Sequence, residues 1–164
     1  MLELPLRTER YPSSRYSEYG MTTVEVAPVV SATAEVVDAF HRLIPQLSSS
    51  SSPITMAQLE EIIGDSTTTV FTARDGETIV GLLTLVVFRI PTGVRAWIED
   101  VVVDERARGK GVGGALNHAA LSMARQRGAK TVDLTSRPSR EAANRLYQRI
   151  GFVRRDTNVY RYEL

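Results

Sequence analysis

Residues 94–128 read VRAWIEDVVVDERARGKGVGGALNHAALSMARQRG, and this stretch decides the fold class. Its valine run, 101–103, suits a strand that is covered on both faces. From Val112 onward, apolar residues recur at helical spacing until Gly128, a residue type that commonly ends helices. The pattern predicts a strand, a glycine-rich turn and a helix in direct succession.

The turn reads Arg108-Gly109-Lys110-Gly111-Val112-Gly113-Gly114, with four glycines in its last six residues. Glycine lets the backbone approach a ligand without interference from a Cβ atom. The first N–H groups of the following helix have no partner inside the helix, and the helix dipole makes this end positive. The turn therefore predicts an anion site that is best suited to a pyrophosphate, with Arg108 and Lys110 adding positive charge.

Two other phosphate-binding motifs do not fit this turn. A Walker loop needs Ser or Thr after Gly-Lys, whereas Gly111 follows Lys110. The glycines match the G-x-G-x-x-G of dinucleotide-binding proteins, and Asp133 follows about twenty residues later. However, the turn follows a β-rich region, and only about fifty residues remain after it. A full dinucleotide-binding fold is therefore excluded.

The whole chain predicts an α/β fold with a mixed sheet of about seven strands and about four helices. The Asp75-Gly76 pair is a strong hairpin signal, and strand 94–103 is expected to run parallel to strand 130–136. Strands are expected at 24–28, 67–74, 78–90, 94–103, 130–136, 152–155 and 158–162, and helices at 32–47, 56–64, 112–128 and 139–151. Residues 1–20 show no clear period and are expected to form a poorly ordered extension to a domain at 22–164.

Composition limits the classes of protein. The chain has 164 residues, which suits one domain, and it lacks cysteine and has two histidines, so we expect no disulfide and no metal site. No apolar run approaches the roughly 20 residues that span a bilayer, and no signal peptide is evident, so a cytoplasmic protein without a membrane partner is expected.

Charge is distributed unevenly along the sequence. From Asp104 to the end there are 13 basic and 6 acidic residues, whereas the preceding part has 7 basic and 13 acidic residues. This asymmetry fits an anionic ligand for the C-terminal part, and it fits two solvated faces equally well. No motif supports nucleic-acid binding, and we expect none.

Two segments resemble signatures of the GCN5-related N-acetyltransferases. Residues 108–113, RGKGVG, are similar to the family's Arg/Gln-x-x-Gly-x-Gly/Ala signature. Residues 141–152, EAANRLYQRIGF, resemble its second signature, a helix with Leu-Tyr followed by Gly-Phe. The resemblance covers about residues 22–164 and implies a single GNAT-like domain whose central sheet is splayed.

The resemblance implies acetyl-CoA as a co-substrate and requires no metal. The pyrophosphate is expected on the backbone amides of the loop, and the pantetheine arm along the preceding strand, where a backbone N–H near Val101 polarises the thioester carbonyl. Asn144 is expected to bind the coenzyme too. The implied coenzyme-binding residues are Val101, Val102, Val103, Arg108, Gly109, Lys110, Gly111, Val112, Gly113, Gly114 and Asn144.

Acetyl transfer needs an acceptor for the proton of the amine. Glu99 is our first choice, directly or through water, and the alternation of a strand predicts that Asp100 points to the other face. The family resemblance implies that Tyr147 protonates the leaving thiolate or hydrogen-bonds its sulfur. Glu99 as a surface acid, Tyr147 as a core residue and Asn144 as a surface cap are the structural alternatives.

The predicted function is direct acetyl transfer from acetyl-CoA to the primary amine of a small molecule. Two alternatives stay open, a non-catalytic acyl-CoA-binding or sensing module and an acetyltransferase for protein N-termini or lysines. The sequence does not identify the acceptor. A homodimer is compatible with the resemblance, although no motif marks it.

Overall fold

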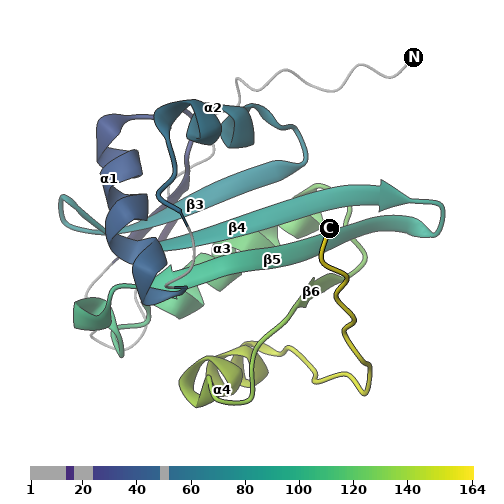
Figure 1. The fold of residues 1–164 in the computed structure, drawn as a ribbon. Coiled ribbons are helices and arrows are strands. Elements are labelled where there is room, and N and C mark those ends of the chain that lie inside the picture. Colours follow the sequence, from purple (N-terminus) through teal and green to yellow (C-terminus); the bar gives the residue numbers. More distant parts are fainter. Residues whose placement is uncertain (1–13, 17–23, 49–51) are drawn as a thin grey trace. The chain divides into compact units, whose positions relative to one another are not determined.

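The computed structural model describes residues 14–16, 24–48 and 52–164, which fall into two compact units, Met1–Leu134 and Thr135–Leu164. The first unit contains a six-stranded sheet in the order β1-β2-β3-β4-β5-β6 (Figure 1). All neighbouring strands are antiparallel except β5 and β6, which are parallel, so the sheet is mixed as predicted. The strands are β1 Ser14–Tyr16, β2 Val24–Pro28, β3 Thr68–Asp75, β4 Thr78–Ile90, β5 Gly93–Val103 and β6 Val132–Leu134.

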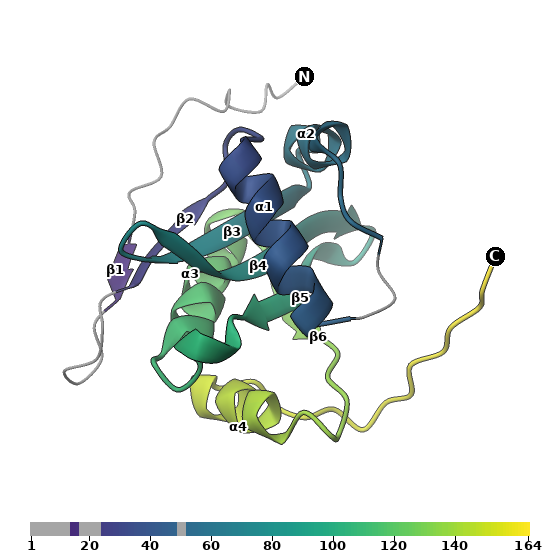
Figure 2. The same ribbon diagram turned by 60° about the vertical axis from the view of Figure 1, so that its left-hand side comes forward.

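Helices cover both faces of this sheet (Figures 1 and 2). On one face, α1 (Ala34–Leu43) and α2 (Met56–Gly64) form a core with Leu82 and Val102 of the central strands. On the other face, α3 (Val112–Gln126) packs against β2 to β5. Successive residues of a strand point to opposite faces, so each face of the central strands has its own helical cover.

The predicted strand–turn–helix–strand unit is confirmed. The strand β5 leads through a 3₁₀ turn, η2 (Glu105–Ala107), and the glycine loop into α3, and β6 then pairs in parallel with β5. The end of α3 is a Schellman motif, because the N–H groups of Gly128 and Ala129 donate to the carbonyls of Arg125 and Ala124. The Asp75-Gly76 hairpin is also confirmed between β3 and β4.

The first helix is shorter than the predicted range 32–47. It ends at Leu43 and continues as a 3₁₀ turn, η1 (Ile44–Gln46). Pro45 explains this change, because proline has no N–H to donate to the preceding helical turn. Similarly, the predicted strand 130–136 is reduced to the three residues of β6.

The second unit contains one helix, α4 (Glu141–Ile150), within residues 135–164. The predicted strands at 152–155 and 158–162 are wrong, because no regular secondary structure follows α4. Valine and aromatic residues are common in strands, but a strand also needs a partner for its backbone groups, and Val153, Val159 and Tyr160 are exposed here.

Strand β1 lies inside the predicted N-terminal extension, and it pairs with β2 over three residues. The rest of the range 1–20 lies outside the described residues, so a poorly ordered extension there stays a prediction. Six strands are therefore described where about seven were expected, and the α/β class with a mixed sheet and four α-helices is confirmed.

Replacing Gly81 by alanine is expected to destabilise the first unit by about 1–3 kcal/mol. A Cβ atom at this position in β4 meets side-chain atoms of Leu116 and Val112 at 3.0 Å and the carbonyl oxygen of Val102 at 3.3 Å. Urea unfolding followed by circular dichroism measures the change. Gly64→Ala is the control, because a Cβ there has open space and the free energy of unfolding should not fall. Equal losses in both variants would contradict this packing.

Candidate active site

The glycine loop forms the entrance to α3 in a left-handed backbone conformation. Gly109 and Gly111 have φ angles of +78° and +82°, which non-glycine residues rarely adopt. Gly111 is the N-cap of α3 and supplies no side-chain hydrogen bond to the helix. The first N–H groups of α3 therefore lack side-chain capping at a helix end that favours anions.

Side chains from three other elements hold the loop and its approach. Arg42 of α1 forms an ion pair of 3.0 Å with Asp104, whose other carboxylate oxygen caps the turn η2. The backbone N–H of Glu105 donates to the side-chain oxygen of Gln46 at 3.0 Å. Lys110 lies 3.9 Å from Asp75 of the β3–β4 hairpin. Sequence reasoning missed these contacts, since nothing local marks residues that meet across such separations.

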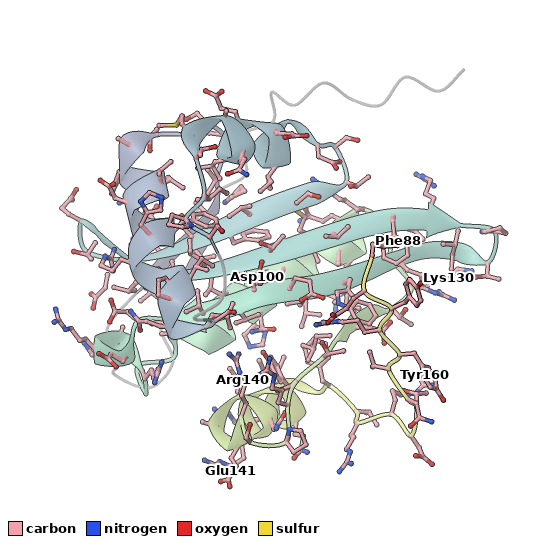
Figure 3. The ribbon with its side chains drawn as sticks, in the orientation of Figure 1. Phe88, Asp100, Lys130, Arg140, Glu141 and Tyr160 are labelled. Atoms are coloured by element: carbon pink, nitrogen blue, oxygen red, sulfur yellow. The ribbon has the colours of Figure 1, made fainter. Side chains whose placement is uncertain are left out.

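A bulge interrupts β5 just before the valine run. Thr84 of β4 pairs with Glu99, whereas Leu82 pairs with Val102, so β5 contains one extra residue. Asp100 lies at this bulge and has a φ angle of +50° (Figure 3). Among the described residues, no other non-glycine residue has a positive φ angle. Regular alternation stops at this bulge, so opposite faces for Glu99 and Asp100 stay a prediction that alternation alone no longer supports, and both side chains are exposed.

Beyond the bulge, one edge of β5 has no strand partner among the described residues of the first unit. The strand β6 pairs only with Ala96 to Ile98. The N–H of Asp104 donates to β4 at Val80, so by alternation the backbone groups of Val101 and Val103 face the opposite edge. The guanidinium of Arg108 reaches that edge and donates to the carbonyl of Val103 at 3.4 Å.

The predicted coenzyme residues of the first unit are thus contiguous along this edge and the loop. Val102 and Val112 are buried and fill the core with their side chains. Gly109, Lys110 and Gly111 are exposed. This division agrees with coenzyme contacts made by the main chain.

Glu99 lies on β5, and its carboxylate has one described partner. The indole Nε1–H of Trp97 donates to Glu99 Oε1 at 2.6 Å. The two residues are two positions apart in a strand, so their side chains share a face. Sequence reasoning passed over Trp97, although it is the single tryptophan of the chain.

Tyr147 belongs to the second unit and is fixed by the end of α4. Gly151 has a φ angle of +110°, and the N–H groups of Gly151 and Phe152 donate to the carbonyls of Gln148 and Tyr147. This is a Schellman motif. It places the Phe152 ring edge-on to the Tyr147 ring, with 5.8 Å between the two ring centroids. The Leu-Tyr…Gly-Phe signature is therefore a helix end that orients a tyrosine. Burial raises the pKa of Tyr147, and the nearby Arg140 opposes this shift.

Asn144 supports the turn before α4. Its side-chain nitrogen donates to the carbonyl of Arg137 at 3.0 Å, and the carbonyl of Pro138 lies 3.5 Å away. The donor end of the amide is thus engaged within the second unit. The helix α4 begins at Glu141 with Arg140 as its N-cap, two residues after the start of the expected range 139–151.

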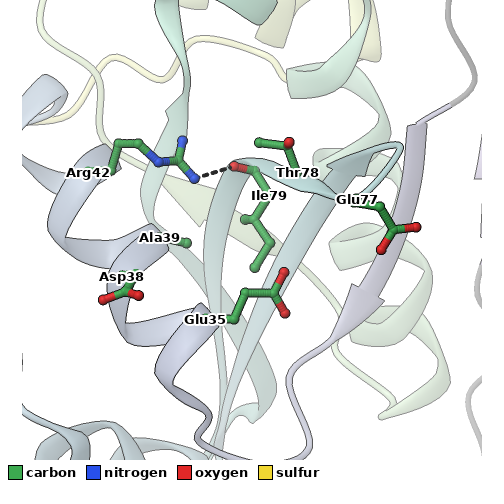
Figure 4. A pocket seen from close by; sticks show the side chains of 7 residues that line it. All are labelled: Glu35, Asp38, Ala39, Arg42, Glu77, Thr78 and Ile79. Atoms are coloured by element: carbon green, nitrogen blue, oxygen red, sulfur yellow. Dashed lines mark hydrogen bonds between the residues drawn. The ribbon is translucent and has the colours of Figure 1, made fainter.

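A separate pocket of about 210 Å³ lies between α1 and the β3–β4 hairpin (Figure 4). Arg42 donates from its wall to the carbonyl of Ile79 at 2.9 Å. Glu35, also on the wall, is hydrogen-bonded by Arg74, which lowers the pKa of that carboxyl. None of the predicted site residues lines this pocket. Among the described residues, no three His, Asp or Glu side chains gather as metal ligands, and no helix is both long and apolar enough to cross a bilayer.

Known proteins resemble this chain in sequence and in fold. N-alpha-acetyltransferase 30 of Schizosaccharomyces pombe is 34% identical over 73 residues, which are 44% of this chain and 48% of that protein, so the match spans about half the length of this curated relative. Among solved structures, the fold is similar to that of the aminoglycoside acetyltransferase meta-AAC0020, from an uncultured soil metagenomic sample, in complex with trehalose. The superposition has a TM-score of 0.75 at 19% identity and covers 86% of this chain and 95% of that one.

A third similar structure is that of AAC(6')-Iy in complex with the bisubstrate analogue CoA-S-monomethyl-acetylneamine. It has a TM-score of 0.71 at 15% identity and covers 86% of this chain and 98% of that one. At this level of identity, the two solved structures support the fold. The model of the acetyltransferase (GNAT) family matches residues 36–152, which include the bulged strand, the glycine loop and α4. This chain therefore belongs to the acetyltransferase (GNAT) family.

Proposed function

We propose that the protein is an N-acetyltransferase that transfers an acetyl group from acetyl-CoA directly to the primary amine of a small molecule. The observation that carries the proposal is the glycine loop, which leaves the first N–H groups of α3 without a side-chain cap and takes positive φ at Gly109 and Gly111. Family membership supports acetyl-CoA as the acyl donor, since the GNAT family uses it.

In this proposal the diphosphate of the coenzyme binds the backbone amides from Arg108 to Gly114. Two oriented features favour an anion there, the positive end of the helix dipole and uncapped N–H groups. The amides of the pantetheine arm pair with the β6-side edge of β5 at Val101 and Val103, where Arg108 also donates to the Val103 carbonyl. Asn144 remains a candidate ligand through its side-chain oxygen, because the nitrogen is engaged by the turn.

The proposed reaction has one bond exchange and two proton transfers. The neutral amine nitrogen attacks the acetyl carbonyl carbon, and the bond from that carbon to the coenzyme sulfur breaks. Glu99 takes the proton lost by the amine, directly or through water, and Tyr147 gives a proton to the thiolate. The N–H of Val101 stabilises the charge that develops on the carbonyl oxygen. Placing Tyr147 beside this edge is part of the proposal.

The small-molecule acceptor is the finer part of the proposal. Protein N-termini are the second candidate, favoured by the similarity to N-alpha-acetyltransferase 30 over 73 residues. A non-catalytic acyl-CoA sensor would share the loop but would not depend on Glu99 or Tyr147. The homodimer and the cytoplasmic location stay predictions.

A thiol-release assay tests the proposal. Purified protein is given acetyl-CoA with amino sugars, aminoglycosides, polyamines, peptides with free N-termini, or lysine peptides with blocked N-termini. We expect acceptor-dependent release of free thiol with a small amine. Thiol release with peptides but with none of the small amines would show that the acceptor is a protein amine. Binding of acetyl-CoA without release for any amine would contradict the enzyme and favour the sensor.

A further inference from the structure

Trp97 and Glu99 form a local unit on one face of β5. The indole N–H donates to the Glu99 carboxylate at 2.6 Å, a short contact between an N–H donor and a charged acceptor. Hydrogen bonds to ionised groups are among the stronger ones in proteins. Trp97 is half-buried, whereas Glu99 is exposed. The contact therefore joins a constrained ring to an otherwise solvent-facing carboxylate.

The sheet fixes Trp97 from both sides. Its backbone pairs with Val86 of β4 and with Asp133 of β6, so strands flank the indole on either side. Side chains in such register neighbour each other on one face, which limits the rotamers open to a large ring. Trp97 is thus a rigid donor.

The sheet constrains Glu99 on one side only. Thr84 of β4 is its partner, but β6 ends at Leu134, opposite Ile98. The next residue of β5 is Asp100, where the strand geometry breaks. Glu99 therefore has a paired strand on the β4 side and, in the described parts of the chain, none on the β6 side. The indole N–H is the hydrogen-bond donor described for its carboxylate.

We propose that Trp97 is a positioning residue for Glu99, which rests on the function proposed above. The indole holds the carboxylate in one orientation and occupies Oε1, so Oε2 faces the incoming amine and accepts its proton. A general base works efficiently only when its lone pair is aimed at the proton that it removes. Without the indole, the exposed side chain of Glu99 samples several rotamers, and few of them are productive.

Fluorescence tests the contact without any need for turnover, because Trp97 is the single tryptophan. Two other charged side chains share its face, Asp133 in register on β6 and Arg95 on β5. We expect the emission of the wild-type protein to change when acid protonates the Glu99 carboxylate, and this transition to vanish in Glu99→Gln and persist in Asp133→Asn. An unchanged transition in Glu99→Gln, or none in the wild type, would overturn the contact.

A double-mutant cycle tests the positioning role. Trp97→Phe keeps an aromatic ring and removes the N–H, and it is expected to lower kcat about tenfold while the KM for acetyl-CoA stays within about twofold. In the Glu99→Gln background the same change should cost less than about twofold, because no base remains to be positioned. Equal losses in both backgrounds, or no loss in the wild type, would overturn the proposal and assign Trp97 a packing role.

The two assays separate failure of this inference from failure of the proposed function. If the enzyme turns over but Trp97→Phe costs the same in both backgrounds, the positioning role of Trp97 is contradicted and the proposed acetyltransferase activity is not. Absence of turnover with every amine contradicts the enzyme, and with it any role of Trp97 in catalysis, whereas the fluorescence titration still reports whether the indole contacts Glu99.

Discussion

Replacing Glu99 by glutamine is expected to lower kcat by about two to four orders of magnitude while the affinity for acetyl-CoA stays within about twofold. Glutamine keeps the size of the side chain and an oxygen that accepts from the Trp97 indole, so the local structure should persist. It has no lone pair basic enough to take a proton from the amine. Steady-state kinetics and calorimetry on the same preparation measure both quantities.

The pH dependence of this variant gives a second readout. A free alkylamine has a pKa near 10, so its neutral fraction rises about tenfold for each pH unit between about 7 and 9. The rate of Glu99→Gln should rise more steeply than that of the wild type, because hydroxide, whose concentration also rises about tenfold for each pH unit, can take the proton that Glu99 no longer accepts. A constant ratio between wild type and variant across this range would contradict a general-base role.

Asp100→Asn is the matched control for Glu99→Gln. Asparagine tolerates the left-handed conformation that Asp100 adopts at the bulge, so this change removes the charge without strain. We expect kcat to change less than about threefold, since one general base suffices for the reaction. The reverse pattern, a large loss in Asp100→Asn and a small one in Glu99→Gln, would assign the base to Asp100.

Replacing Tyr147 by phenylalanine is expected to lower kcat by about two to three orders of magnitude with little change in stability. The variant retains the ring that packs edge-on against Phe152 and loses only the hydroxyl group, which carries the proton. Tyr160→Phe is the control, because that tyrosine is exposed and its hydroxyl has no proposed role. Loss of thiol release in Tyr147→Phe at unchanged acetyl-CoA affinity supports the acid. Full activity in Tyr147→Phe would remove Tyr147 from the reaction.

The raised pKa of Tyr147 predicts how kcat responds to alkaline pH. Burial disfavours the charged phenolate, so the folded pKa lies above the ordinary value of 10.0 and the proton stays on the hydroxyl through neutral pH. Ionisation of this group should therefore cause no fall in kcat up to about pH 9. A decline of kcat below that pH which disappears in Tyr147→Phe would contradict this assignment.

The sequence predicted those parts of the fold that short segments determine. The Asp75-Gly76 turn, the strand before the loop and the helix after it depend on neighbouring residues, so their local patterns were sufficient. The same holds for Gly151, which ends α4 and turns Phe152 back onto Tyr147. These signals arise from backbone geometry within about six residues.

Features that depend on distant partners were not predictable from one sequence. The bulge at Asp100 exists because β5 has one residue more than β4 between two paired positions, and a single strand contains no information about its partner's register. The ion pair of Arg42 with Asp104 joins residues 62 positions apart. The segment after α4 shows the opposite error, since two strands were expected there and the structure has none.

The central claim is that the coenzyme binds the main chain where the glycine loop enters α3, and calorimetry with coenzyme A tests it most directly. Gly111→Ala and Gly128→Ala form a matched pair, because both glycines have open space for a Cβ and φ angles of +82° and +78°, at opposite ends of α3. Each substitution should cost about 1–2 kcal/mol in stability, from the same left-handed strain.

The account predicts that the wild-type protein binds coenzyme A, that Gly111→Ala weakens binding at least about tenfold, and that Gly128→Ala binds within about twofold of the wild type. No binding to the wild type, or equal weakening in both variants, would contradict it.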